Sequence, residues 1–491
     1  MIARGFVGGL FVLVGGLLVA VLPPSTALLQ LDLLREVRAT TTGRMIGLAV
    51  VLLGLGLLAA AWLRLCRYAA RAAAAEQGEA VDLVRYATVV WSAPLLLAPP
   101  LFSRDGWSYA AQGMLARLDL SPYEHGPSVL SGPVVEAVDP RWLDTPAPYG
   151  PLPLLLGDLA ARLTGNPWML VIGHRTMALL GLVMLAWAVP RMARWTGRSP
   201  AFATALVLPS PLMLANGVAG LHNDLLMVGL MASALVVAVE RGWAWAAVLG
   251  GLAAAVKLPG GLVCIAVALA TLPAGAAHAD RLRRLVAVAG VAVGALVGLG
   301  IAAGLGAGWV AALGVPGTVR TPLSLPTVFG GLLDRLAAGA GIGAEGDLLT
   351  LVRACAALAA LGLAGWWSLR RPTGDRVEAV RLAGLLAGAL VVLGPVVHLW
   401  YFLWPLPFLA TLPAGRSATA ALVAASVVLG LVAPLNSSLH GAYLAILFGS
   451  AMVAGLLLVL LATGAARKRL RWIAEAEWLP VGDSSAGPRI G

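Results

Sequence analysis

Charge is scarce in this chain of 491 residues, because Asp, Glu, Lys and Arg together make up only 12% of it. Hydrophobic residues make up 60%. A soluble domain of this length would need far more charge to remain in solution. Apolar runs of about 20 residues recur from end to end, and each is long enough to cross roughly 30 Å of hydrocarbon. The composition therefore predicts an all-α polytopic membrane protein.

Cysteine is also rare, and several cofactor motifs are missing. Cys66, Cys264 and Cys355 lie at unrelated spacings and form neither a disulfide framework nor a metal-ligand pattern. The sequence contains no Walker loop and no strand, Gly-rich turn and helix unit for a nucleotide. The net charge is +11, but no basic patch is interleaved with aromatic residues. We therefore expect no metal, no cofactor and no nucleic-acid partner.

Apolar length predicts about fourteen transmembrane helices. They fall at about 5–22, 46–63, 84–102, 167–190, 200–217, 223–240, 243–257, 259–273, 285–306, 347–369, 382–398, 401–415, 418–434 and 441–463. Lys257 is followed by Leu-Pro-Gly-Gly within an otherwise apolar stretch, which predicts a break or a re-entrant turn at that point.

Basic clusters indicate the orientation. If the N-terminus is cytoplasmic and the helices alternate, nearly every cluster lies on the cytoplasmic side. These clusters are Arg64/Arg67/Arg71, Arg191/Arg194/Arg198, Arg281/Arg283/Arg284, Arg370/Arg371/Arg376/Arg381 and Arg467/Lys468/Arg469/Arg471. We therefore expect a multi-pass protein of the plasma (inner) membrane with its active site on the outer face. The predicted parts are a transmembrane domain over 1–466, a large first outer loop at 103–166, a second outer segment at 307–346 and a cytoplasmic tail at 467–491.

The first outer loop contains the leading catalytic candidate. Asp105 would lie just beyond the third helix, where a carboxylate can accept a proton from a sugar hydroxyl. It could equally pair with Arg104 or cap a short helix over 106–117. Farther along, Leu152 to Leu163 predicts an amphipathic helix with a leucine face that lies flat on the outer leaflet.

Other polar residues gather at the predicted outer edge. Lys257, Arg320, His222 and His398 could neutralise a lipid-linked phosphate as its bond to a sugar breaks. Each of them could instead reach ordinary lipid headgroups or cap a helix. Tyrosines beside proline-stiffened turns could bind sugar rings or belong to an interfacial aromatic belt.

Several strings give the chain a family resemblance. They are Ser103-Arg104-Asp105, Tyr109-Ala110-Ala111-Gln112-Gly113, Ser121-Pro122-Tyr123, Asp144-Thr145-Pro146-Ala147-Pro148-Tyr149-Gly150-Pro151, Leu221-His222-Asn223-Asp224 and Val256-Lys257. With them the chain resembles the polyprenol-phosphate-mannose-dependent α-1,6-mannosyltransferases of the actinobacterial cell envelope, which are GT-C glycosyltransferases. The resemblance covers about residues 85–450.

The resemblance implies a GT-C-type fold with an acidic base in the first large outer loop, which Asp105 matches. It implies a β-linked polyprenyl-phosphate mannose donor and transfer with inversion to a lipid-anchored α-1,6-mannan, the backbone of lipomannan and lipoarabinomannan. Many GT-C enzymes carry paired acids at this position, whereas this chain carries one. Asp224 is then the candidate for a second acidic role.

The resulting hypothesis is an inverting mannosyltransferase. Its predicted catalytic residue is Asp105, its donor phosphate-binding residues are Lys257, Arg320, His222 and His398, and its substrate-binding residues are Arg104, Tyr109, Tyr123, Asp144, Tyr149, Asn223 and Asp224. Two alternatives remain: a GT-C enzyme for another lipid-linked sugar such as arabinose, and a lipid or sugar transporter. Transporters concentrate polar residues near the bilayer midplane, whereas here they crowd the outer edge.

Overall fold

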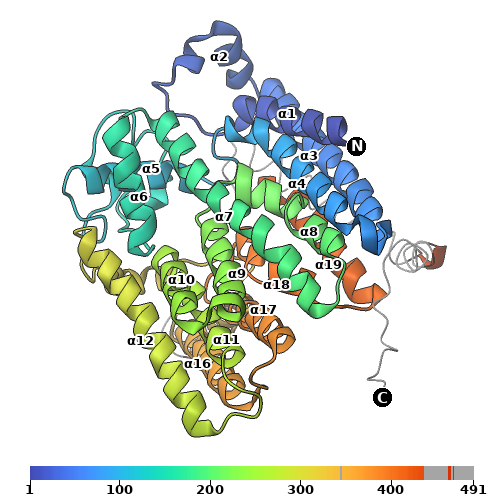
Figure 1. Cartoon of the computed structure of the whole chain (residues 1–491). Helices are drawn as coiled ribbons and strands as arrows, with labels where there is room; N and C mark the ends of the chain where they lie inside the picture. The colour runs from blue at the N-terminus through green and yellow to red at the C-terminus, as the bar shows by residue number, and fades with distance from the viewer. Residues whose placement is uncertain (343–345, 436–462, 466–467, 469–491) are drawn as a thin grey trace. The chain divides into compact units, whose positions relative to one another are not determined.

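Helices account for all regular secondary structure in the part of the chain that is described (Figure 1). The computed structural model describes residues 1–342, 346–435, 463–465 and 468. Its α-helices are α1 (Ile2–Val19), α2 (Asp32–Ala39), α3 (Thr41–Arg71), α4 (Gln77–Leu96), α5 (Asp105–Arg117), α6 (Pro151–Leu163), α7 (Pro167–Thr196), α8 (Pro200–Val207), α9 (Asp224–Arg241), α10 (Trp243–Val256), α11 (Val263–Ala270), α12 (His278–Ala302), α13 (Trp309–Ala312), α14 (Val315–Thr318), α15 (Leu325–Gly339), α16 (Asp347–Arg370), α17 (Arg376–Leu393), α18 (Leu406–Thr411) and α19 (Arg416–Leu431). The prediction of an all-helical protein is confirmed for these residues.

Tighter and wider turns connect the α-helices. The 3₁₀ turns are η1 (Ala27–Gln30), η2 (Ala74–Glu76), η3 (Pro127–Val129), η4 (Pro140–Trp142), η6 (Leu258–Leu262), η7 (Leu399–Leu403) and η8 (Ala433–Leu435). The segment η5 (Met213–Ala219) is a π-helix. The break predicted at Lys257 is confirmed, because α10 ends at Val256 and α11 begins only at Val263, after η6.

Five described helices are long and apolar enough to cross a membrane, namely α1, α3, α7, α12 and α16. The number rises to six if η5 and α9 form one broken span. Other apolar helices are shorter, including α10 and α19. The predicted helix at 441–463 lies outside the described residues, so the count of about fourteen crossings stays a prediction.

The chain divides into two compact units, and each is discontinuous in sequence. The first comprises residues 1–107, 189–222 and the chain from 410 onward, and the second comprises 108–188 and 223–409. The boundaries fall within α5, within α7, just before α9 and within α18.

Glycines allow close helix packing in the first unit. A Cβ on Gly8 of α1 would lie 2.8 Å from the carbonyl oxygen of Gly54 on α3, and one on Gly15 would lie 2.7 Å from that of Gly47. The two glycines are seven residues apart on each helix, so they form one face. Small residues of this kind let the backbones of membrane helices approach closely. The glycines of α1 and α3 therefore form a helix-packing surface.

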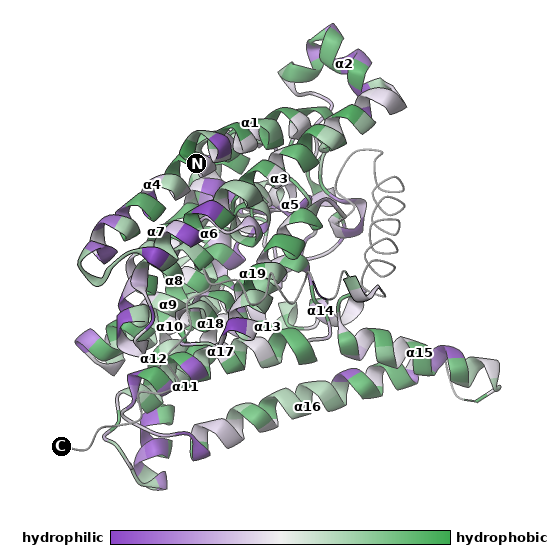
Figure 2. Ribbon diagram, turned by 90° about the vertical axis from the view of Figure 1, so that its right-hand side faces the viewer, coloured by the Kyte–Doolittle hydropathy of each residue, from purple (hydrophilic) through white to green (hydrophobic). Residues whose placement is uncertain are grey.

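In the second unit, α15 and α16 form a hairpin with an exposed apolar surface. Figure 2 shows the two helices side by side, with hydrophobic residues along much of both. In the most apolar 18-residue stretch of α16, only 17% of the residues are buried within the protein. Such a surface is unfavourable in water and favourable in hydrocarbon. The long exposed apolar helices give the chain the character of a membrane protein.

Arginines close the ends of several helices. Arg281 at the start of α12 donates to the carbonyl oxygens of Leu369 and Arg371, at 3.1 and 2.6 Å, where α16 ends. In the first unit, Arg198 donates to Leu412 O at 2.9 Å, just past α18. Cations are favourable at helix C-termini, where carbonyls lack partners within the helix. These residues therefore fix helix ends, whatever their place relative to the membrane.

The amphipathic helix predicted at 152–163 is present as α6. Leu159 and Leu163 are 48% and 88% exposed, whereas Asp158 is buried and pairs with Arg162 at 2.9 Å. The predicted leucine face is thus exposed only toward the end of the helix, because Leu152, Leu155 and Leu156 are half-buried. Its position on the outer leaflet stays a prediction.

Candidate functional site

Asp105 lies beside His222 in the first unit. Asp105 begins α5, and its backbone N–H donates to Ser103 Oγ at 3.1 Å. Ser103 thus accepts a hydrogen bond from the first residue of the helix. The carboxylate Oδ2 lies 3.8 Å from His222 Nε2, and the two side chains are 15% and 1% exposed respectively. The sequence predicted both residues in the site but did not predict that they form a pair.

The backbone around this pair is unusual. His222 Nδ1 lies 2.5 Å from the carbonyl oxygen of Asn216 in η5. Leu221, directly before His222, has φ +54°, and Phe102, shortly before Asp105, has φ +66°. Such values are strained for residues other than glycine. The two segments are joined by a hydrogen bond from Leu101 N to Ala219 O at 3.1 Å.

In the second unit, Lys257 and Asp224 form an ion pair. Lys257 Nζ lies 3.2 Å from Asp224 Oδ1, and the side chains are 15% and 1% exposed. Trp404 Nε1 donates to the same carboxylate oxygen at 2.6 Å. Asp224 opens α9 and Lys257 has extended backbone between α10 and η6, so helix ends supply both charges. The Trp404 contact was not predicted from sequence.

Aromatic rings surround the Lys257 ammonium group. The nitrogen lies 4.1 Å from the centre of the Tyr401 ring and 5.3 Å from that of Trp404, distances typical of cation–π contacts. His398 stacks on Trp400 with the ring centres 4.4 Å apart, and it meets the edge of Tyr401 at 5.5 Å. The structure therefore brings His398 and Lys257 onto one aromatic cluster, as two of the predicted phosphate-binding residues.

The segment predicted to form the first outer loop reaches the same region of the second unit. Gly150 N donates to Val256 O at 3.0 Å, directly before Lys257. A Cβ on Gly150 would collide with the Ala255 carbonyl, so only glycine permits this approach. The neighbouring Tyr149 packs edge-to-face on Tyr109 with ring centres 5.2 Å apart. Two of the predicted sugar-binding tyrosines are thus in contact.

Tyr123 occupies a different environment from Tyr109 and Tyr149. It is 6% exposed and packs in a cluster with Ala147, Leu154 and Ala312. Its buried hydroxyl has no hydrogen-bond partner among the described residues. Burial raises the pKa of this hydroxyl above its ordinary value, so the group stays neutral. Gly308 lies directly against the ring, so the first and second outer segments meet here.

The remaining predicted residues are more scattered. Arg320 is exposed, with the like-charged Arg353 nearby. Its neighbour Thr321 accepts a hydrogen bond from Val397 N at 2.9 Å, which ties this segment to the residue before His398. The other three are the exposed Asp144, the half-buried Arg104 and the buried Asn223, whose Nδ2 has no partner among the described residues.

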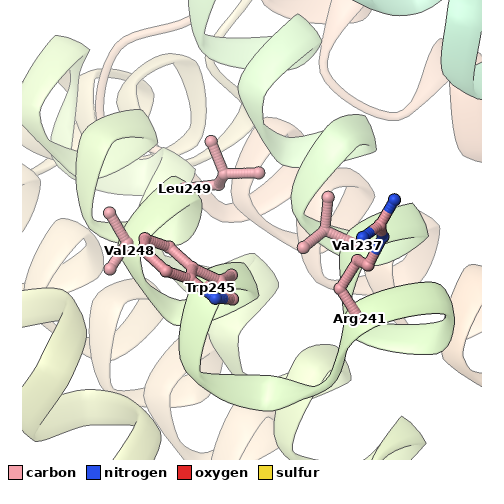
Figure 3. Close-up of a pocket in the computed structure, with 5 residues that line it drawn as sticks. All are labelled: Val237, Arg241, Trp245, Val248 and Leu249. Carbon is pink, nitrogen blue, oxygen red and sulfur yellow. The ribbon is translucent and has the colours of Figure 1, made fainter.

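A hollow of about 640 Å³ in the second unit lies away from these residues (Figure 3). It is lined by Val237, Arg241, Trp245, Val248 and Leu249, from the end of α9 and the start of α10. Asp224 is at the opposite end of α9, roughly 25 Å away at the rise of an α-helix. No convergent polar groups line the hollow, so we do not assign the candidate site to it. No group of three or more His, Cys, Asp or Glu residues in the described part of the chain could hold a metal ion.

The long apolar helices are those of a membrane protein. The Asp105–His222 and Lys257–Asp224 pairs at helix ends make a candidate active site. No solved structure matches the chain. The family described as alpha-(1->6)-mannopyranosyltransferase, N-terminal domain, matches residues 2–273, and the MptB C-terminal domain matches 326–463. The chain belongs to this alpha-(1->6)-mannopyranosyltransferase family.

Its relatives come from mycobacteria and corynebacteria. A protein of Mycobacterium tuberculosis named alpha-(1->6)-mannopyranosyltransferase A is 32% identical over 463 residues, which cover 89% of this chain and 85% of that protein. A probable alpha-(1->6)-mannopyranosyltransferase of Mycolicibacterium smegmatis is 30% identical over 465 residues, covering 87% and 81%. Alpha-(1->6)-mannopyranosyltransferase B of Corynebacterium glutamicum is 30% identical over 397 residues, covering 74% and 65%.

Proposed function

We propose that this protein transfers mannose from a polyprenyl-phosphate mannose donor to a lipid-anchored α-1,6-mannan, with inversion, in the synthesis of lipomannan and lipoarabinomannan. Family membership over both halves of the chain supports mannosyl transfer. The exposed apolar helices support a lipid-carried donor, because such a donor is confined to the bilayer. The proposal includes a GT-C-type fold with about fourteen crossings and an active site on the outer face of the plasma membrane.

Asp105 is the proposed base. The 6-hydroxyl oxygen of the acceptor bonds to the anomeric carbon of mannose while the bond from that carbon to the phosphate oxygen breaks. Asp105 takes the hydroxyl proton, and polyprenyl phosphate leaves from the opposite side. The observation that carries this role is the Asp105 carboxylate itself, which is 15% exposed and lies at the start of a helix beside a buried histidine.

Lys257 is the proposed main contact to the donor phosphate, together with His398 and Arg320. An ammonium group has three N–H donors, so Lys257 can contact Asp224 and still donate to a phosphate oxygen. A cation at that point offsets the charge that grows on phosphate as the glycosidic bond breaks. The remaining proposed substrate-binding residues are Arg104, Tyr109, Tyr123, Asp144, Tyr149, Asn223 and Asp224.

The test is transfer by purified protein with defined donors. Wild type should form an α-1,6 linkage from polyprenyl-phosphate mannose, and Asp105→Asn should abolish transfer while the protein remains folded. Asp119→Asn is the matched control, because Asp119 is exposed in the same outer segment and its φ of +56° suits Asn. Near-normal turnover by Asp105→Asn would remove Asp105 from the mechanism. Transfer of arabinose but not mannose would favour the other lipid-linked sugar, and flux through proteoliposomes without product would favour transport.

A further inference from the structure

His222 is held in one orientation by the π-helix. The Asn216 carbonyl can only accept a hydrogen bond, so at 2.5 Å His222 Nδ1 must carry a hydrogen. Asn216 is itself anchored, since its Nδ2 donates to Leu429 O at 3.2 Å. The ring therefore has one nitrogen fixed to the backbone and the other, Nε2, directed at Asp105.

The backbone around His222 and Asp105 is strained. Two of the three non-glycine residues with positive φ in the described chain, Phe102 and Leu221, flank this pair. Strained backbone and π-helical turns persist where the surrounding structure requires them, and both concentrate at functional sites. Gly220 leaves no room for change, because a Cβ there would lie 2.6 Å from Asn216 O and 2.8 Å from His222 Cε1.

We infer that His222 is a positioning residue for the proposed base, and that it accepts a hydrogen bond from Asp105 once Asp105 has taken the proton of the acceptor hydroxyl. The inference rests on the proposed function and deepens it. In the neutral Nδ1–H form, Nε2 carries a lone pair and has no hydrogen to offer. It can therefore bond the protonated carboxyl group but not the carboxylate.

The chemistry follows from this difference. Breaking the acceptor O–H bond and forming the Asp105 O–H bond creates a donor that Nε2 can use. An interaction that forms as the proton moves stabilises the transition state more than the ground state, so it raises kcat. The present separation of 3.8 Å must shorten by about 1 Å for a hydrogen bond, and such contacts are often long before substrate binds. This role differs from the phosphate contact predicted for His222 from sequence.

Two substitutions separate action on Asp105 from simple anchoring. Asn places its amide nitrogen near the position of His Nδ1, so His222→Asn keeps the bond to Asn216 O and loses the group that faces Asp105. Gln places an amide near the position of Nε2, so His222→Gln keeps an acceptor for Asp105. We expect His222→Asn to lower kcat by at least about tenfold with donor KM within twofold, and His222→Gln to retain most of kcat.

A third variant disturbs the ring without removing it. Gly220→Ala should lower kcat as His222→Asn does, because the new methyl group displaces the ring from Asn216 O. Gly56→Ala is the control, since a Cβ at Gly56 meets nothing within 4 Å. Equal losses in the Asn and Gln variants, or a raised donor KM with unchanged kcat, would overturn the inference in favour of anchoring or of phosphate binding.

A double-mutant cycle on Asp105 and His222, measured as melting temperatures, tests the inference independently of activity. Wild type, Asp105→Asn, His222→Asn and the double variant are melted in the same detergent. Asn at position 105 offers an amide N–H in place of the protonated carboxyl group, and this N–H can bond Nε2 only while His222 is present. The shifts in melting temperature are therefore expected to be non-additive. If wild type transfers no mannose, the proposed function fails and this cycle alone decides the inference. Additive shifts would overturn it.

Discussion

Lys257 and Asp224 are opposite charges with little access to solvent, so their stability depends on each other. Removing one partner of a buried pair leaves the other charge uncompensated, which typically costs about 3–5 kcal/mol. Replacing both partners is far less costly. We therefore expect Lys257→Met to lower the melting temperature more than the double variant Lys257→Met/Asp224→Asn does. A double variant that melts below Lys257→Met would contradict the pairing at 3.2 Å.

Trp404 offers a narrower test at the same place. Trp404→Phe keeps an aromatic ring to stack on Tyr401, whose centre lies 4.3 Å away, but removes the 2.6 Å hydrogen bond to Asp224. Hydrogen bonds to charged groups contribute about 1.5–3 kcal/mol. We expect a corresponding fall in melting temperature. Trp245→Phe is the control, because Trp245 is 70% exposed, and an equal effect in both variants would contradict the role of the hydrogen bond.

Individual site residues could be predicted from sequence, but their partners could not. Polar side chains are so few in this chain that Asp105, His222, Asp224 and Lys257 stand out at the ends of apolar runs. Which of them meet depends on how distant helix ends come together. Trp404 is 180 residues from Asp224, and no local pattern links them. The π-helix that holds His222 was likewise not predicted from sequence.

The α1–α3 contact allows a test at the scale of the helix. Gly54→Ala would place a methyl group 2.7 Å from the Gly8 carbonyl oxygen, forcing the two backbones apart. Overpacking of this kind costs about 1–3 kcal/mol. Gly56→Ala, two residues along the same helix, meets nothing and gains helix propensity. We expect only Gly54→Ala to lower the melting temperature, and similar values for both variants would contradict the packing.

Arg281 provides a second test at this scale. Arg281→Ala leaves the carbonyl oxygens of Leu369 and Arg371 without their donor at the end of α16. An unsatisfied buried acceptor costs about 1–3 kcal/mol, and these carbonyl groups are part-buried, so a cost toward the lower end is expected. Arg283→Ala is the matched control, since Arg283 is 81% exposed and pairs only with the half-exposed Asp280. We expect a lower melting temperature for Arg281→Ala alone. An unchanged melting temperature would mean that Arg281 does not stabilise the end of α16.

The apolar length of a segment predicted that a long helix is present. It did not predict where that helix begins and ends, nor did it reveal the short helices. The segment predicted at 285–306 begins at His278, because charged residues of its first turn also join the helix. The segment predicted at 200–217 is divided into α8 and the π-helix η5. Within the second outer segment, α15 was not predicted at all. Its residues contact α16, and this tertiary packing leaves no signal in a search for long apolar runs.

For the whole molecule, the distribution of basic residues predicts which ends face the cytoplasm. Arg141 in the first outer loop and Arg283 before the predicted helix at 285–306 fall on opposite sides, and their side chains are 66% and 81% exposed. Single cysteines at these positions, in a chain with Cys355 replaced by Ser, report the orientation. Arg141→Cys should react with a membrane-impermeant maleimide in intact cells, and Arg283→Cys only after permeabilisation.

The predicted orientation depends on several basic clusters together, so loss of the single arginine at position 283 should not invert the protein. Arg281 and Arg284 remain beside it, and Arg370, Arg371, Arg376 and Arg381 lie on the same predicted side. The reverse pattern of labelling would place Asp105 and the first outer loop in the cytoplasm. A nucleotide-linked donor would then be available to the site, and the argument for a lipid-carried donor at the outer face would fail. Labelling of both positions in intact cells would instead place residues 141 and 283 on the same side of the membrane. The number of crossings between them would then be even, whereas the predicted number is odd.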